Sequence, residues 1–144
     1  MWIVFALGAS VLWGLSYVLF EQVYKKISIM TALWIVCLIM FGAMLIGSIL
    51  TGSLKPDMFA IQSSKKLQWL LLGGIATAIL ADVFIALSIT NKNATLAGLV
   101  EISYPIFIAL FAYLLFKQTQ LNTATIIGGI LIFTGVFIIY FFNR

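Results

Sequence analysis

The stretch LAGLVEISYPIF, residues 96–107, places a carboxylate and a proline inside an apolar run. Glu101 and Pro105 stand four residues apart, close to one turn of an α-helix. Proline has no backbone N–H, so Pro105 cannot bond the carbonyl four residues earlier, which belongs to Glu101. The sequence therefore predicts a helix kink where a carboxylate and a freed backbone acceptor form a local site for a cation or a proton.

The rest of the chain is as apolar as this stretch. Its 144 residues are 64% hydrophobic and 8% charged, with a mean hydropathy of +1.21. Soluble domains are about 25% charged, so a chain of this composition cannot cover a surface that faces water. The composition predicts an all-α integral membrane protein whose solvent is lipid.

Five apolar stretches are long enough to cross a bilayer, which takes roughly 20 residues. We expect one transmembrane unit over residues 1–144, with spans at about 2–20, 29–50, 67–90, 94–116 and 122–142. The connections contain Lys, Asn, Gln or Pro, which is typical of a water interface. The apolar N-terminus indicates a first membrane helix rather than a signal peptide.

The positive charges favour neither orientation of these five spans. The loops on one side hold Lys55, Lys65, Lys66 and Lys117, and the other side holds Lys25, Lys26, Lys92 and Arg144. Orientation normally follows an excess of Lys and Arg on the cytoplasmic side, and here there is none. One interpretation of the equal counts is a single orientation that the charges specify only weakly and that the first helix or a partner sets. The sharper hypothesis is that the chain inserts both ways and forms an inverted, antiparallel homodimer of ten helices.

Several classes of function have no support in the sequence. The chain has no histidine and one cysteine, Cys37, which excludes an intrachain disulfide and a His/Cys zinc cluster. The basic residues anchor helix ends and do not suggest nucleic acid. No nucleophile–base set is visible, so we expect no enzyme, no metal and no cofactor.

Two acids lie inside the predicted spans, where a charge costs roughly 2.5–3.5 kcal/mol. Asp82 precedes Asn91 by nine residues and Glu101 follows Asn93 by eight, so each lies about 12–14 Å from the same tight turn. We expect both near the midplane, facing one cavity in which at least one exchanges a proton for a cationic substrate. The small residues around each acid also fit plain helix packing, with each acid bonded to a neighbour.

The first span offers polar and aromatic residues at helical spacing, among them Glu21. The rings of Trp13 and Tyr17 could hold a cation over a ring face. Tyr17 and Glu21 also fit interfacial anchoring. We expect a substrate and proton site made of Asp82, Glu101, Pro105, Tyr104, Trp13, Tyr17 and Ser10. In the last span we expect a dimer contact through Gly128, Gly129 and Gly135, because glycines let helices approach closely.

Two stretches carry a family resemblance. ALGASVLWGLSYVLF, residues 6–20 with the pair Trp13-Gly14, and EISYPIFIALFAYLLFKQTQLNTATIIGGILIFTGVFI, residues 101–138, resemble the first and the last two helices of an EamA-type domain. The resemblance implies a half-size member of the drug/metabolite transporter superfamily, with helices 1, 3 and 4 around a central cavity. Members usually carry two inverted units, which implies an antiparallel dimer for a lone unit.

The resemblance also implies an exporter of small metabolites, amino acids or drug-like cations. Lys117-Gln118 stands where the family often has Gly-Glu, and Trp34 where it often has arginine, which leaves substrate and coupling ion open. We expect a proton-coupled or exchange transporter in the cytoplasmic membrane of a prokaryote, working by alternating access. A channel-like passive facilitator and a non-transporting accessory half-subunit are the alternatives.

Overall fold

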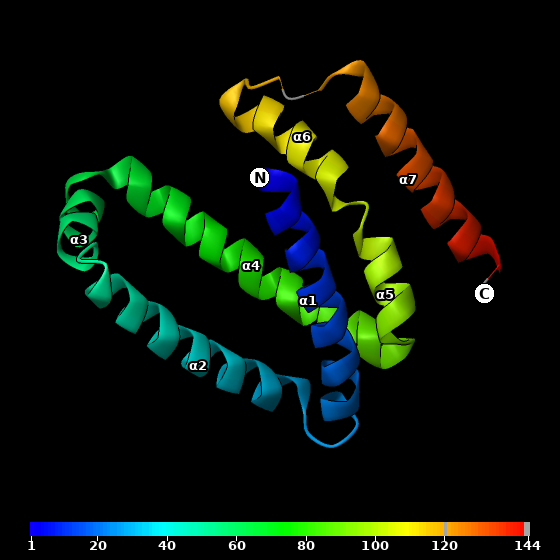
Figure 1. Ribbon diagram of the computed structural model, residues 1–144, viewed down its shortest axis with the longest axis horizontal. Helices are drawn as coiled ribbons and strands as arrows, with labels where there is room; N and C mark the ends of the chain where they lie inside the picture. Colours follow the sequence, from blue (N-terminus) through cyan, green and yellow to red (C-terminus); the bar gives the residue numbers. More distant parts are fainter. Residues whose placement is uncertain (120, 143–144) are drawn as a thin grey trace. The chain divides into compact units, whose positions relative to one another are not determined.

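The computed structural model describes residues 1–119 and 121–142, and Arg144, counted above among the basic residues, lies outside them. Within the described residues the chain forms seven helices joined by short turns (Figure 1). They are α1 (Trp2–Tyr24), α2 (Ile29–Leu50), α3 (Leu54–Ser63), α4 (Lys65–Asn91), α5 (Ala94–Glu101), α6 (Tyr104–Phe116) and α7 (Thr123–Phe142).

Five helical stretches of the described chain are long and apolar enough to cross a membrane. They are Trp2–Tyr24, Ile29–Leu50, Lys65–Asn91, Ala94–Phe116 and Thr123–Phe142, the fourth being formed by α5 and α6 together. These stretches coincide with the predicted spans apart from small differences at their ends. The prediction of an all-helical, multi-pass membrane protein is therefore confirmed.

The first span is longer than expected, because α1 continues through Glu21 to Tyr24. Hydropathy marks where a chain leaves the lipid, whereas a helix continues as long as its backbone bonds are made. Glu21 therefore stands in helical register with Tyr17, one turn earlier on the same face. The chain then turns, and the Ser28 side chain caps α2 by accepting the Thr31 N–H at 3.2 Å.

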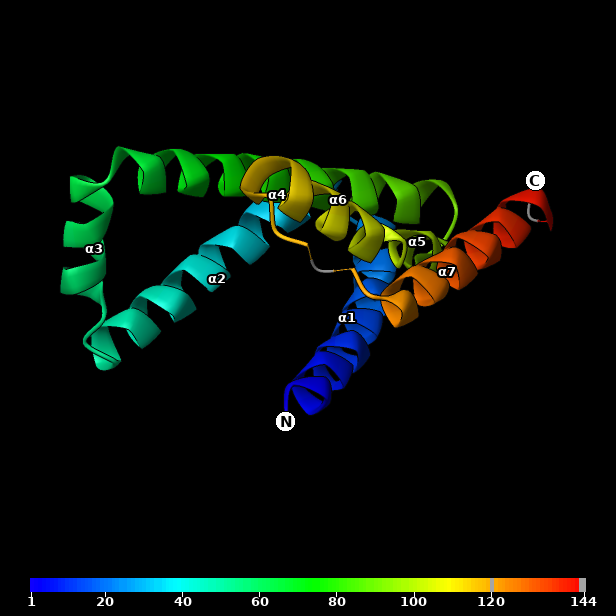
Figure 2. The same ribbon diagram turned by 90° about the horizontal axis from the view of Figure 1, so that it is seen from above.

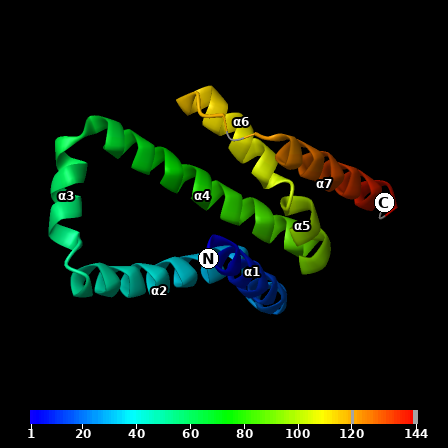
Figure 3. The same ribbon diagram turned by 45° about the horizontal axis from the view of Figure 1, so that its top comes forward.

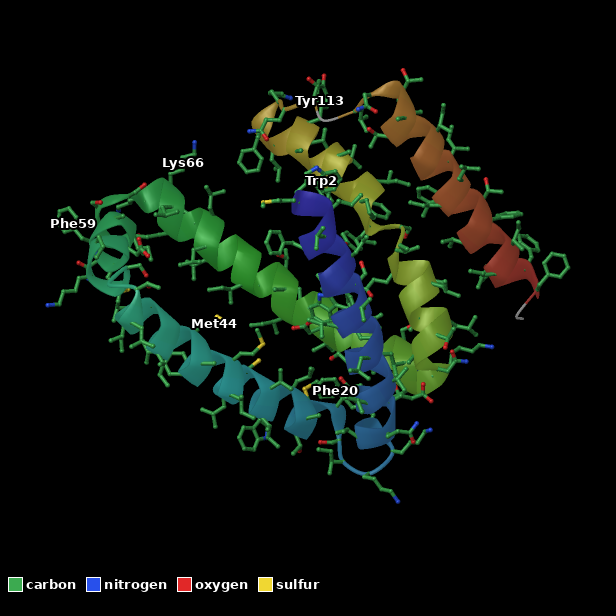
Figure 4. All side chains as sticks on the ribbon, in the orientation of Figure 1. Trp2, Phe20, Met44, Phe59, Lys66 and Tyr113 are labelled. Atoms are coloured by element: carbon green, nitrogen blue, oxygen red, sulfur yellow. The ribbon has the colours of Figure 1, made fainter. Side chains whose placement is uncertain are left out.

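A helix also occupies the connection expected at residues 51–66. Gly52, with a φ of +71°, turns the chain after α2, and α3 then runs from the end of α2 to the start of α4 (Figure 2). The Gln68 side chain of α4 donates to the Ile61 carbonyl of α3 at 2.9 Å, which fixes this corner. Phe59 projects away from α3 and is exposed (Figure 4).

The helix contacts divide the chain into two compact units. One unit comprises Met1–Glu21 and Ser88–Arg144, and the other comprises Gln22–Leu87. In the first unit α5 packs against α7, and Ile106 of α6 lies against Gly129 of α7. In the second unit α2 contacts α3.

Very few side chains are buried in the described residues. The buried apolar residues are Ala32, Ala86, Ile89, Ala94 and Ala97. Four of these five are alanines, and small side chains let helix backbones approach closely. Large apolar side chains such as those of Trp34 and Phe41 remain exposed, as expected for a chain whose solvent is lipid.

Candidate functional site

The fourth span is interrupted between α5 and α6 (Figure 3). α5 ends at Glu101 and α6 begins at Tyr104, with Ile102 and Ser103 in the turn between them. Pro105 stands in the first turn of α6, where its missing N–H costs the helix nothing. The predicted kink is confirmed, and it places Glu101 at the last helical position before the break.

The carboxylate of Glu101 has a partner on α1. The Tyr17 hydroxyl donates a hydrogen bond to Glu101 Oε2, and the contact is partly buried. The Tyr17 ring lies close to α5, since a Cβ added to Gly98 would stand 3.5 Å from Tyr17 Cδ2. The ring that bonds the carboxylate therefore also lies beside Gly98, one turn of α5 before Glu101.

Trp13 extends this contact by one more turn of α1. The Trp13 and Tyr17 ring centroids are 5.8 Å apart with an interplanar angle of 64°, an edge-to-face pair. Trp13 itself is 58% exposed. The structure therefore brings together three predicted site residues, and a carboxylate beside aromatic rings can hold a proton or an organic cation.

Glu21 contacts the opposite end of α5. Its Oε2 accepts the Ala94 N–H at 2.8 Å, and Asn93 Oδ1 accepts the Leu96 N–H at the same distance. The first N–H groups of a helix have no partner within it, so both contacts satisfy donors that the helix leaves open. From the sequence alone Glu21 fits an interfacial anchor, although its position one turn after Tyr17 indicates a shared face.

Two other predicted site residues lie apart from this contact. The Ser10 hydroxyl donates to the Ala6 carbonyl of its own helix at 3.0 Å. Tyr104 opens α6 beside Pro105, and its side chain is 55% exposed. Neither side chain takes part in the hydrogen bond between α1 and α5.

Asp82 lies on α4 and belongs to the second compact unit, whereas Glu101 belongs to the first. The Asp82 side chain is exposed. The expectation that Asp82 and Glu101 share one pocket stays a prediction. In the described residues, no group of three His, Cys, Asp or Glu is arranged to hold a metal ion.

The glycines of α7 differ in their surroundings. A Cβ added to Gly129 would meet Ile106 Cγ1 at 3.4 Å, so Gly129 packs within the chain. A Cβ added to Gly128 or Gly135 would meet no atom within 4 Å. The dimer contact through these glycines stays a prediction, and the open positions are the ones available for it.

An open cavity of about 530 Å³ lies between α5 and α7. Its lining is almost entirely apolar and consists of Val100, Phe133, Thr134, Val136, Phe137 and Tyr140. None of these is a predicted site residue. The cavity therefore does not coincide with the carboxylate contact, although Val100 directly precedes Glu101 in the chain.

The sequence matches a known protein family. The profile of the EamA-like transporter family matches residues 1–141, which include all five candidate spans. No match was found among curated proteins or among solved structures. A transporter family of this kind acts on small molecules at a lipid bilayer. The chain belongs to the EamA-like transporter family.

Proposed function

We propose that the chain is a proton-coupled or exchange transporter that exports small metabolites, amino acids or drug-like cations. One observation carries this proposal: Glu101 ends α5 at a helix break, hydrogen-bonded to Tyr17 and next to Trp13. An acid inside a membrane span is expensive and usually serves a pathway. A carboxylate holds either a proton or a cation at one time, so release of one follows binding of the other.

The Tyr17 hydroxyl supports this exchange chemically. It supplies a hydrogen bond to Glu101 when neither proton nor substrate is bound, so the carboxylate is never without a partner in lipid. A cationic solute that arrives at Glu101 displaces the hydroxyl and finds the Trp13 and Tyr17 rings beside it. We propose Asp82, the other acid within a span, as a second acid of the transport pathway.

For the assembly, we propose that this five-helix unit pairs with an inverted copy in a cytoplasmic membrane. The balanced Lys and Arg counts on the two sides support insertion in both orientations. The open positions at Gly128 and Gly135 support a close helix contact on α7. Two inverted units would place their carboxylates near the midplane and alternate access by rocking.

The exchange is tested with purified protein in liposomes that enclose a fluorescent pH indicator. Ethidium, an aromatic cation, and a panel of amino acids are the probes, and counter-movement of protons is the readout. We expect Glu101→Gln to lower coupled flux at least about tenfold, because it removes the group that binds both partners. Asp57→Asn, on exposed α3, is the matched control and is expected to leave flux unchanged.

Three outcomes of this assay would contradict the proposal. Coupled flux that survives Glu101→Gln would show that the site is elsewhere. Solute flux without proton movement would favour a passive facilitator. An absence of flux for every probe would favour an accessory subunit. Reporters on each end of the chain test the assembly separately, because labelling from one side only would exclude the inverted homodimer.

A further inference from the structure

The helix that carries Glu101 is attached to α1 at both ends. At its start the Ala94 N–H donates to Glu21 Oε2 at 2.8 Å, and at its last residue Glu101 accepts from Tyr17. Between these points Gly98 lies against the Tyr17 ring. Ala94 is 96% buried, with a relative exposure of 4%, so this attachment is a close helix contact and not a surface feature.

α5 needs such an attachment because it is short. It has 8 residues and is followed by the turn at Ile102 and Ser103, so α6 does not continue its axis. A helix of this length has few backbone hydrogen bonds of its own. Its position relative to α1 therefore depends on side chains, and the Glu21 carboxylate reaches the first residue of α5.

We infer that Glu21 is a positioning residue that holds α5 on α1 and thereby keeps Glu101 within reach of Tyr17. Glu21 acts at a distance from the reacting carboxylate, through the orientation of the helix between them. Without the bond to Ala94, the start of α5 can shift relative to α1, within the limits set by the two-residue turn after α4 and by the packing of α5 against α7. The effect of Glu21 on transport rests on the proposed function. The attachment of α5 to α1 by Glu21 does not depend on that function.

Three substitutions of Glu21 separate the effect of its side-chain length from the effect of its charge. Glu21→Gln keeps an acceptor oxygen at the same length and removes the charge. Glu21→Asp keeps the charge and shortens the side chain by one methylene, and Glu21→Ala removes both. We expect Gln to preserve the attachment and both Asp and Ala to lose it. Asp57→Ala on α3 is the control for removal of an exposed acid.

The attachment is measured by electron spin resonance on the full chain in liposomes. Cys37 is the only cysteine, so Cys37→Ser gives a background for spin labels at Leu19 of α1 and Thr95 of α5, both exposed. We expect one narrow distance distribution with Glu21 or Gln. For Asp and Ala we expect a broad distribution, with the ratio of attached to detached α5 reduced about tenfold.

Transport of the same variants gives the second readout. We expect the transport rate to fall in the order unsubstituted protein, Glu21→Gln, Glu21→Asp and Glu21→Ala. The rate of Glu21→Gln should lie within about threefold of that of the unsubstituted protein. A narrow distribution of label distances in both Glu21→Asp and Glu21→Ala would overturn the inference. A broad distribution in Glu21→Gln together with a narrow one in Glu21→Asp would overturn it as well. If Ala does not fold, Gln and Asp decide the question. Normal transport by Glu101→Gln would overturn the proposed function, while the label distances would still decide the role of Glu21.

Discussion

The polar side chains of the α1–α5 region and of the α2–α3 region are used in different ways. Around α2 and α3, Thr51 donates to Ser53 and Gln68 donates to Ile61, so the partners stand between 2 and 7 residues apart. Between α1 and α5, the Tyr17–Glu101 and Ala94–Glu21 partners stand 84 and 73 residues apart. The first kind of bond joins segments that are neighbours in the sequence, and the second kind joins helices that are far apart in it.

One glycine of the α1–α5 region has close surroundings that the glycines of α4 lack. Gly98 of α5 lies against the Tyr17 ring, whereas a Cβ added to Gly73 or Gly74 of α4 would meet no atom within 4 Å. A glycine in a helix interior is otherwise a weak choice, costing roughly 0.5–1 kcal/mol relative to alanine. At Gly98 a Cβ would stand in ordinary van der Waals contact with the Tyr17 ring, at 3.5 Å from Cδ2, so a side chain larger than that of alanine would meet the ring.

The largest effect is expected from Tyr17→Phe, which breaks the contact that distinguishes the α1–α5 region. A hydrogen bond to a charged group contributes roughly 1.5–3 kcal/mol, so coupled flux in liposomes should fall at least about tenfold. Tyr104→Phe is the matched control, since Tyr104 also lies beside the break but outside the contact. Equal effects of the two substitutions would mean that the Tyr17 hydroxyl has no special role.

A smaller effect is expected from Gly98→Leu. The new side chain would occupy the space of the Tyr17 ring, and overpacking of this kind costs about 1–3 kcal/mol. We expect a lower midpoint of thermal unfolding in detergent, followed by circular dichroism. Gly74→Leu, in open surroundings on α4, should change the midpoint little. If the two variants unfold alike, the approach of Tyr17 to α5 is not tight.

The smallest effect is expected in the α2–α3 region, from Ser28→Ala. Loss of this cap leaves the Thr31 N–H without its acceptor and typically costs about 1 kcal/mol. The loss should appear as a slightly lower unfolding midpoint in detergent, with coupled flux in liposomes unchanged. A fall in flux as large as that of Tyr17→Phe would remove the distinction between the two regions.

Most of the helical architecture follows from the sequence. Hydropathy alone locates the five spans, because roughly 20 apolar residues in a row have few alternatives to a membrane helix. The break after Glu101 follows from Pro105, which removes one backbone donor. The helix α3 was not predicted, since its ten residues contain too few apolar positions to distinguish a short helix from a loop.

The site was predicted only in part, for a different reason. Periodicity shows that Trp13, Tyr17 and Glu21 share a face of one helix, but it does not show which helix they meet. Tyr17 and Glu101 were both named as site residues, and their direct bond emerges only from the fold. Glu21 was passed over because a carboxylate near the end of a span is equally typical of an anchor at the water interface.

The two residues of α1 that hydrogen-bond to α5, Tyr17 and Glu21, are four positions apart, about one helical turn, and this spacing has a consequence for sequence change. Each added or deleted residue rotates the rest of an α-helix by about 100°. An insertion between Tyr17 and Glu21 would therefore swing one of the two side chains away, even if every original residue were retained. The count of residues between them is constrained more strictly than the identities of the three residues in that interval.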